Sequence, residues 1–479
     1  MRRHLSVAPA LLLTLFTLAP LAQQIDRTKP PVPGPVPELK VPAWTTGKLS
    51  NGAQLIVAER RGLPLISFSI TFQGGANQFE KPDKLGMSAF TASMLREGTR
   101  TRDADALALA LQLLGTNVGG GIGDENGSIS FLSTTEKFAP TLDILADMLL
   151  NSTFPAPALE RLRAQRLVAL ANQNAQPEFI GSRVFSRVLY GVAHPFGQLP
   201  DETTIKAVTR DDVVAFYKEY YQPGRAIVTV AGDIDAAGAK AAAEKALAGW
   251  TGGGSKPSFA YPPIPDARAT TIYAVDKPGA KQSVFNIGLP GPPRNTPDYM
   301  PLQVMNFILG GHFQSRLNAN IREEKGYSYG VNSSFAYGKG PGPFRAGGGI
   351  VTDKTDAALV EFMKELRGIQ GARPITDEEM QMAKDTLIQR LPAQFSSVSA
   401  IGSTITSLYL QDLPPDYYQN YAKAVRALTR DDVLRVAKKY VDLDHLNIVI
   451  VGDLKSIEAP LKATGIAPIV VLDPEGGQK

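Results

Sequence analysis

The sequence predicts an α+β fold made of two homologous repeats of about 220 residues. The first observation is a hexapeptide that occurs twice, as Val-Thr-Arg-Asp-Asp-Val at 208–213 and as Leu-Thr-Arg-Asp-Asp-Val at 428–433. The second is that each copy begins a helical pattern that reaches a tyrosine, Tyr220 or Tyr440, before an apolar strand pattern. The third is that strand and helix patterns are mixed without strict alternation, which favours α+β over α/β.

The two copies stay in register beyond the hexapeptide. Thr209 and Thr429 are expected N-caps, because a threonine side chain can accept a hydrogen bond from a backbone N–H in the first helical turn. The strand patterns at 226–231 and 446–451 both end in Gly-Asp, at the same offset of 220 residues. A match in register over more than twenty residues indicates duplication of a whole domain.

Upstream segments extend the correspondence. Helical segments that follow a proline-containing turn occur at 155–175 and at 374–393, near the same offset. We expect each repeat to hold a mixed, mainly antiparallel sheet with helices packed on it. In the first repeat the expected strands are 54–58, 65–73 and 128–133, and the expected helices are 83–96, 103–114 and 138–150.

The stretch between the repeats has the composition of a linker. Residues 251–268 contain three consecutive glycines and four prolines, which favour extended or turn conformations. The two repeats are therefore expected at 43–250 and 269–479.

The N-terminal residues 1–22 have the pattern of a signal peptide. Arg2 and Arg3 precede an apolar run at 11–16, and the small residues Ala19 and Ala22 follow. The run is too short for the roughly 20 residues of a spanning helix, and an uncleaved anchor is the alternative. We expect a periplasmic or otherwise exported protein, joined to its signal by a Pro-rich tether at 23–42.

Composition excludes several classes of protein. The formal net charge of the 479 residues is +4 and no basic tract interleaved with aromatics occurs, so nucleic-acid binding is not expected. Cysteine is absent, which excludes disulfides, thiolate chemistry and cysteine-ligated metal. The four histidines, His4, His194, His312 and His445, have no histidine partner three or four positions away, so no helical two-histidine metal site can form.

A specific resemblance lies in residues 84–99. Gly86 precedes a pentapeptide, Met94-Leu95 follows it, and Gly98-Thr99 ends the segment. This frame resembles the zinc-helix region of the inverted zincins, the family of insulin-degrading enzyme, pitrilysin and the mitochondrial processing peptidase. In that family the pentapeptide is His-x-x-Glu-His, in which two imidazoles bind zinc and the glutamate is the general base.

This chain departs from the family pattern at every zinc position. Ala89 and Ser93 stand where the histidines would be, and Ala92 stands where the base would be. The resemblance places the third ligand, a glutamate on a later helix, at Ala169. None of these side chains can ligate zinc or accept the proton of a zinc-bound water. We therefore expect no metal or other cofactor in this chain and no zinc peptidase activity from it alone.

A second family signature is kept in the second repeat. Residues 315–330 resemble a segment in which an arginine and a tyrosine seven residues later face the zinc from the other half of the molecule. The corresponding residues here are Arg322 and Tyr329. The resemblance implies that they bind the substrate main chain and stabilise the oxyanion. The alternative is that Arg322 pairs with a glutamate on its helix and Tyr329 packs in a sheet.

The loss in one repeat and the retention in the other resemble the non-catalytic subunit of a two-chain bacterial peptidase. The resemblance implies a half-chamber, clam-like subunit that binds peptide with a homologous zinc-bearing partner and donates Arg322 and Tyr329 to the partner's site. Metallopeptidase activity is then expected only in that heterodimer, whose zinc lies in the partner. The alternative is a non-enzymatic binding or scaffold protein of the same fold. The glycine-rich stretch 119–123 corresponds to the edge strand that positions peptide in active members, without side chains to hold it.

Overall fold

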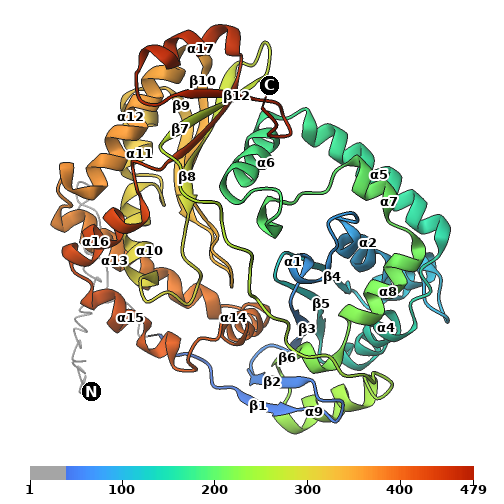
Figure 1. Ribbon diagram of the computed structural model, residues 1–479. Helices are drawn as coiled ribbons and strands as arrows, with labels where there is room; N and C mark the ends of the chain where they lie inside the picture. The colour runs from blue at the N-terminus through green and yellow to red at the C-terminus, as the bar shows by residue number, and fades with distance from the viewer. Residues whose placement is uncertain (1–38, 479) are drawn as a thin grey trace, which may run out of the picture. The chain divides into compact units, whose positions relative to one another are not determined.

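Two six-stranded mixed sheets form the framework of the computed structural model, which describes residues 39–478 (Figure 1). The predicted signal peptide and nearly all of the predicted tether lie outside these residues, so both stay predictions. Among the helices from 39 to 478, none is long and apolar enough to cross a membrane.

The first sheet is built from the first repeat. Its strand order is β1-β2-β6-β3-β5-β4, with β2 parallel to β6 and every other neighbouring pair antiparallel. The bounds are β1 Thr45–Lys48, β2 Gln54–Glu59, β3 Leu65–Gln73, β4 Gly119–Ile122, β5 Asn126–Thr134 and β6 Ala226–Gly232.

The second sheet repeats this topology in the order β12-β7-β11-β8-β10-β9. Five strands correspond one to one, and only the outermost differs, because β12 lies parallel to β7 whereas β1 lies antiparallel to β2. The α+β fold with two homologous repeats is thus confirmed. The bounds are β7 Thr271–Asp276, β8 Gln282–Pro290, β9 Ser328–Phe335, β10 Pro343–Val351, β11 Asn447–Gly452 and β12 Ile469–Leu472.

Helices cover both sheets. In the first repeat they are α1 Ala76–Phe79, α2 Met87–Met94, α3 Ala104–Leu113, α4 Phe138–Asn151, α5 Ala156–Asn174, α6 Pro177–Tyr190, α7 Glu202–Ala207, α8 Arg210–Tyr220 and α9 Ala236–Ala246. In the second they are α10 Tyr299–Leu309, α11 Arg316–Asn318, α12 Thr355–Arg367, α13 Asp377–Arg390, α14 Val398–Leu410, α15 Tyr417–Ala427, α16 Arg430–Tyr440 and α17 Leu454–Ala463.

The repeated hexapeptides begin α8 and α16 as expected. Thr209 Oγ1 accepts from Asp212 N, and Asp212 Oδ2 accepts in return from Thr209 N at 2.8 Å. Thr429 and Asp432 form the same reciprocal pair, with the return bond at 2.9 Å. These capping boxes satisfy backbone N–H groups that a helix start otherwise leaves free.

One expected helix was predicted too long. The expected helix at 83–96 is the shorter α2, and the separate turn α1 precedes it. The chain enters α2 through Gly86, whose φ of +93° lies in the left-handed region that favours glycine. The helical pattern in the sequence continues across this break, so it does not reveal where α2 begins.

Each repeat places one helix on the sheet of the other. Helix α6 packs on β8 and β11 of the second sheet, and α14 packs on β3 and β6 of the first (Figure 1). Val184 of α6 shares a buried cluster with Val284 and Val451, and Ile401 of α14 shares another with Ile227. Each such buried side chain contributes about 1.5–3 kcal/mol, so the exchange binds the two repeats into one unit.

A glycine lies at the same place on both exchanged helices. A Cβ on Gly181 of α6 would lie 2.6 Å from Asn286 Nδ2 of β8, which is too close. A Cβ on Gly402 of α14 would lie 3.6 Å from the side chains of Thr229 and Ala231, which is ordinary contact. The close approach of α6 therefore requires glycine, whereas that of α14 tolerates alanine.

We predict that Gly181→Ala lowers the free energy of unfolding by about 1 kcal/mol or more, because the clash with a fully buried side chain outweighs the gain in helix propensity. The matched variant Gly402→Ala should leave it unchanged or raise it by up to about 1 kcal/mol. Urea unfolding of both variants measures the difference. Equal effects at the two positions would contradict the assigned packing.

Candidate functional site

The three pentapeptide positions that are predicted to have lost the zinc-site residues share one face of α2. Ala89, Ala92 and Ser93 are partly exposed, whereas Phe90 and Met94 are buried in the core of the first repeat. Ser93 Oγ donates to the backbone oxygen of Ala89 at 2.8 Å, so its hydroxyl is used within the helix. The face that would present two imidazoles is in place, but its side chains are methyl groups and one hydroxyl.

The helix that would supply the third ligand runs beside α2. Ala169 lies exposed on α5, and α5 packs against α2. One turn before Ala169, the guanidinium of Arg166 lies 5.3 Å from the centre of the Phe90 ring. Between residues 39 and 478, no three histidine, aspartate or glutamate side chains are grouped so that they could hold a metal. The residues present at this place do not fit zinc.

A carboxylate stabilises the start of α2. Glu80 accepts from Gly86 N at 2.9 Å through one oxygen and from Ser88 N at 2.6 Å through the other. A negative charge at a helix N-terminus satisfies free N–H groups and complements the helix dipole. The frame of the zinc helix is therefore held by protein contacts and needs no metal.

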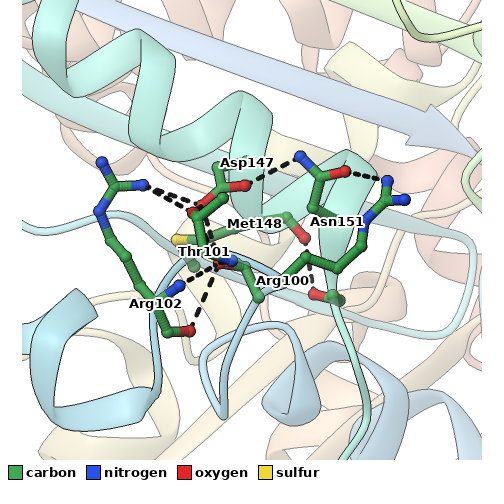
Figure 2. Close-up of polar contacts among 8 residues, drawn as sticks. Arg100, Thr101, Arg102, Asp147, Met148 and Asn151 are labelled. Carbon is green, nitrogen blue, oxygen red and sulfur yellow. Dashed lines mark hydrogen bonds and ion pairs between the residues drawn. The ribbon is translucent and has the colours of Figure 1, made fainter.

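A buried aspartate stabilises the exit from α2 (Figure 2). Asp147 of α4 accepts hydrogen bonds from Thr99 at 2.8 Å, Thr101 at 2.7 Å, Arg102 at 2.9 Å and Asn151 at 2.8 Å. Burial disfavours the charged carboxylate, but these four donors outweigh it and hold the pKa of Asp147 below its usual value. The Gly-Thr exit of the family frame is thus anchored to α4.

The retained arginine lies in an irregular turn of the second repeat. Arg322 belongs to a short π-helix, Ala319–Glu324, which follows α11. Its Nε lies 3.2 Å from Glu323, and its guanidinium lies 4.5 Å from the centre of the Phe313 ring. Pairing with a neighbouring glutamate was the expected alternative for Arg322, and this contact is present. Single π-turns inside helices are frequent at functional sites.

The retained tyrosine projects from the edge strand of the second sheet. The register of β9 against β10 shifts between Ser328 and Val331, which leaves Tyr329 and Gly330 in a β-bulge. Ser328 Oγ donates to the backbone oxygen of Gly349 at 2.7 Å and accepts from Gly330 N at 3.0 Å. Tyr329 is 86% exposed, so it does not pack in the sheet. Bulges commonly re-aim a side chain, and this one turns a phenol toward solvent.

The glycine-rich stretch forms the edge strand β4 of the first sheet, as expected. A Cβ on Gly120 would lie 1.8 Å from the backbone oxygen of Ser128 on β5, so no side chain fits there. Gly121, by contrast, has open space around its missing Cβ. The strand thus includes one glycine that its close pairing requires.

The three histidines of the described part lie in separate places. His194 is buried, and its Nδ1 accepts from Phe196 N at 3.1 Å in a short turn. Burial lowers the pKa of His194 below its usual value. His312 lies 2.8 Å from the backbone oxygen of Phe307, and His445 lies 2.6 Å from Asp442. These are local structural contacts.

A cleft that was not predicted from the sequence lies beside Ala89. Its volume is about 590 Å³, and both repeats line it, through Asn77, Ala89 and Arg166 from the first and Tyr337 and Gln411 from the region after β9 and α14. Arg322 and Tyr329 do not line it. A sign of this cleft in the sequence is Arg166, which precedes Ala169 by one helical turn. That Arg166 lies in a cleft follows only from the packing of α5 against α2, which the sequence does not give.

Two family models match the chain. One, described as insulinase (peptidase family M16), matches residues 64–193. The other, described as the peptidase M16 inactive domain, matches residues 207–387. Together they cover more than half of the sequence. The chain belongs to the M16 peptidase family.

Two bacterial relatives of this chain have different functional names. The chain is 24% identical to a Bacillus subtilis protein named uncharacterized zinc protease YmxG, over 73% of this chain and 84% of that protein. It is 23% identical to a Helicobacter pylori protein named non-peptidase homolog YmxG, over 84% and 92%. The family thus contains proteins named as proteases and proteins named as non-peptidases.

Solved structures agree in fold. The crystal structure of a peptidase M16 inactive domain from Pseudomonas fluorescens matches with a TM-score of 0.78 and 26% identity, over 85% of this chain and 98% of that one. A protease from Helicobacter pylori matches with a TM-score of 0.76 and 18% identity, over 86% and 99%. These matches show the fold, and the residues on α2 and α5 lack the side chains that the family pattern uses to hold zinc.

We predict that restoring four side chains restores zinc binding, because the frame of α2 and α5 is kept. The variant combines Ala89→His, Ala92→Glu, Ser93→His and Ala169→Glu. After dialysis it should hold about one zinc per chain, whereas the unaltered chain holds far less. Metal analysis of the purified proteins measures this. A variant that keeps Ala169 is the control and should lose zinc on dialysis. Failure of the fourfold variant to retain metal would contradict a preserved frame.

We predict that Asp147→Asn lowers the free energy of unfolding by about 2 kcal/mol at pH 7, because it removes a charged acceptor from four donors. The folded pKa of Asp147 lies below its unfolded value near 3.9, so this stabilisation is present above about pH 4 and is lost as the pH falls through the folded pKa. Denaturant unfolding from pH 7 to pH 3 measures the difference. Asp143→Asn, on the exposed side of α4, is the control. A pH-independent difference would refute the assignment.

Proposed function

We propose that this chain is the non-catalytic subunit of a two-chain zinc peptidase of the M16 family. It supplies part of the peptide-binding chamber and donates Arg322 and Tyr329 to the active site of a homologous zinc-bearing partner. The observation that carries the proposal is the exposure of Tyr329, which is 86% accessible although it lies on a sheet strand. A large aromatic side chain displayed by a bulge, without intramolecular packing, suits contact with another molecule.

The chemistry of the pair supports this role. A guanidinium offers fixed N–H donors and a phenol offers one O–H donor, and both can stabilise the oxygen of a peptide carbonyl as negative charge develops on it. Stacking on Phe313 limits the positions of the Arg322 side chain, and the bulge fixes the backbone that carries Tyr329. The closest contact of Glu323 with this guanidinium is at Nε, at 3.2 Å.

Action on a partner is favoured over action within this chain. The vacated zinc positions lie on α2 of the first repeat, and the cleft beside Ala89 has its second-repeat wall from the β9–β10 hairpin, at 336–343. Neither Arg322 nor Tyr329 belongs to that wall. The pair therefore faces elsewhere, where a second chain can bring its zinc.

The proposal includes export. The basic and apolar pattern of residues 1–22 supports a signal peptide, and the absence of cysteine imposes no disulfide requirement on an exported chain. A periplasmic location would place the subunit beside an exported partner.

We predict that Arg322→Ala and Tyr329→Phe each lower the kcat of the reconstituted two-chain enzyme about 100-fold or more, since each removes one donor to the oxyanion. The affinity between the chains should stay within about twofold. Peptide hydrolysis measures kcat, and analytical ultracentrifugation measures assembly.

The control is Asn332→Ala, at an exposed position of the same strand, which should leave both quantities unchanged. Unchanged turnover in both the Arg322 and the Tyr329 variants would remove the proposed role and favour a non-enzymatic scaffold of the same fold.

A further inference from the structure

The cleft beside Ala89 contains a charged group without a partner. Arg166 reaches it from α5 and is partly buried, with its guanidinium over the Phe90 ring at 5.3 Å. Among residues 39–478, no hydrogen-bond acceptor or ion-pair partner contacts this guanidinium. Burial lowers the pKa of Arg166, against the charge of Glu80. A partly buried guanidinium with unmatched N–H groups is unfavourable unless a ligand or water satisfies them.

The neighbouring arginine on α5 shows the contrast. Arg163 also lies near Phe90, but its Nε donates to Glu160 at 3.0 Å and its Nη2 donates to the backbone oxygen of Val208 at 2.7 Å. Arg163 therefore has a structural role that explains its place. Arg166 has no such role.

Glu80 does not neutralise Arg166 by a direct bond. Both oxygens of Glu80 accept backbone N–H groups at the start of α2. Another carboxylate that lines the cleft, Glu125, accepts from Tyr261 and from the backbone N–H groups of Lys339 and Gly340. Glu80 and Glu125 thus have other partners. The third carboxylate in the lining, Asp124, makes no hydrogen bond or ion pair with Arg166 in the described part of the chain.

The other buried polar atoms beside the cleft are not offered to a ligand. Asn77 Nδ2, Tyr337 Oη and Gln411 Oε1 have no well-aligned hydrogen-bond partner among the described residues, but each has almost no accessible surface. Asn77 lies within reach of Tyr261, and Tyr337 lies within reach of Gln303. The cleft of about 590 Å³ therefore offers a ligand the free N–H donors of Arg166.

We propose that the cleft beside Ala89 is a carboxylate-binding site centred on Arg166, which takes the carboxylate of a peptide and does not cleave it. A guanidinium can bind a carboxylate through two parallel N–H bonds. Asp124, Glu80 and Glu125 also line the cleft and repel anions, so they oppose a ligand with one negative charge, such as a carboxylate, less than a dianionic phosphate. This inference concerns the chain alone and does not depend on a partner or on Arg322 and Tyr329.

Isothermal titration calorimetry of the full chain with three N-acetylated peptides tests the proposal. The probes are acetyl-tetra-alanine with a free C-terminal carboxylate, the same peptide as its C-terminal amide, and acetyl-Ala-Asp-Ala-Ala amide. The amide should bind at least tenfold more weakly than the free acid or the aspartate peptide. Whichever of those two binds more tightly identifies the C-terminus or a side chain as the source of the carboxylate.

Arg166→Gln should weaken binding of the better probe at least tenfold. Arg161→Gln is the matched control, because Arg161 lies on the same helix and pairs with Glu97 outside the cleft. Should Arg166→Gln fail to fold, protection of Arg166 from phenylglyoxal by the probe, mapped by mass spectrometry on the unaltered chain, replaces it. Equal binding of acid and amide, tighter binding of inorganic phosphate, or no loss in Arg166→Gln would each overturn the proposal.

Discussion

The architecture depends on the reciprocal exchange of α6 and α14 between the two repeats. Each helix covers a sheet that its own repeat does not build, and each buries Val or Ile side chains there. The exchange makes the two sheets one cooperative unit, so the frame around α2 survives without a metal. Capping by Glu80 and the contacts of Asp147 stabilise that frame locally.

The loss of catalytic residues and the retention of others then have different structural consequences. On α2, Ala89, Ala92 and Ser93 form a small-residue face, and Ala89 borders the cleft in which Arg166 has no partner among residues 39–478. On β9 the bulge leaves Tyr329 exposed, so its phenol O–H is accessible as a hydrogen-bond donor. We propose that the first repeat binds a ligand and does not catalyse peptide hydrolysis. We propose that the second repeat contributes side chains to the site of another molecule.

Much of this was predictable from local patterns, and the rest was not. The capping boxes at Thr209 and Thr429 and the duplication follow from residue types at fixed spacing, whereas the lost zinc ligands were predicted from the resemblance to a family. The break at Gly86, the bulge at Tyr329 and the contact of Arg166 with Phe90 depend on backbone register and on packing between distant elements, which periodicity does not encode.

The central claim, that Tyr329 faces a zinc-bearing partner chain, has one direct test. A photoreactive benzoylphenylalanine at position 329 of the full-length chain, expressed and irradiated in its native host, reports what lies against this residue. The account predicts a crosslink to a homologous chain that carries an intact His-x-x-Glu-His motif, identified by mass spectrometry at the crosslinked peptide. A crosslink only to a second copy of this chain, or to no homologous chain at all, would contradict it.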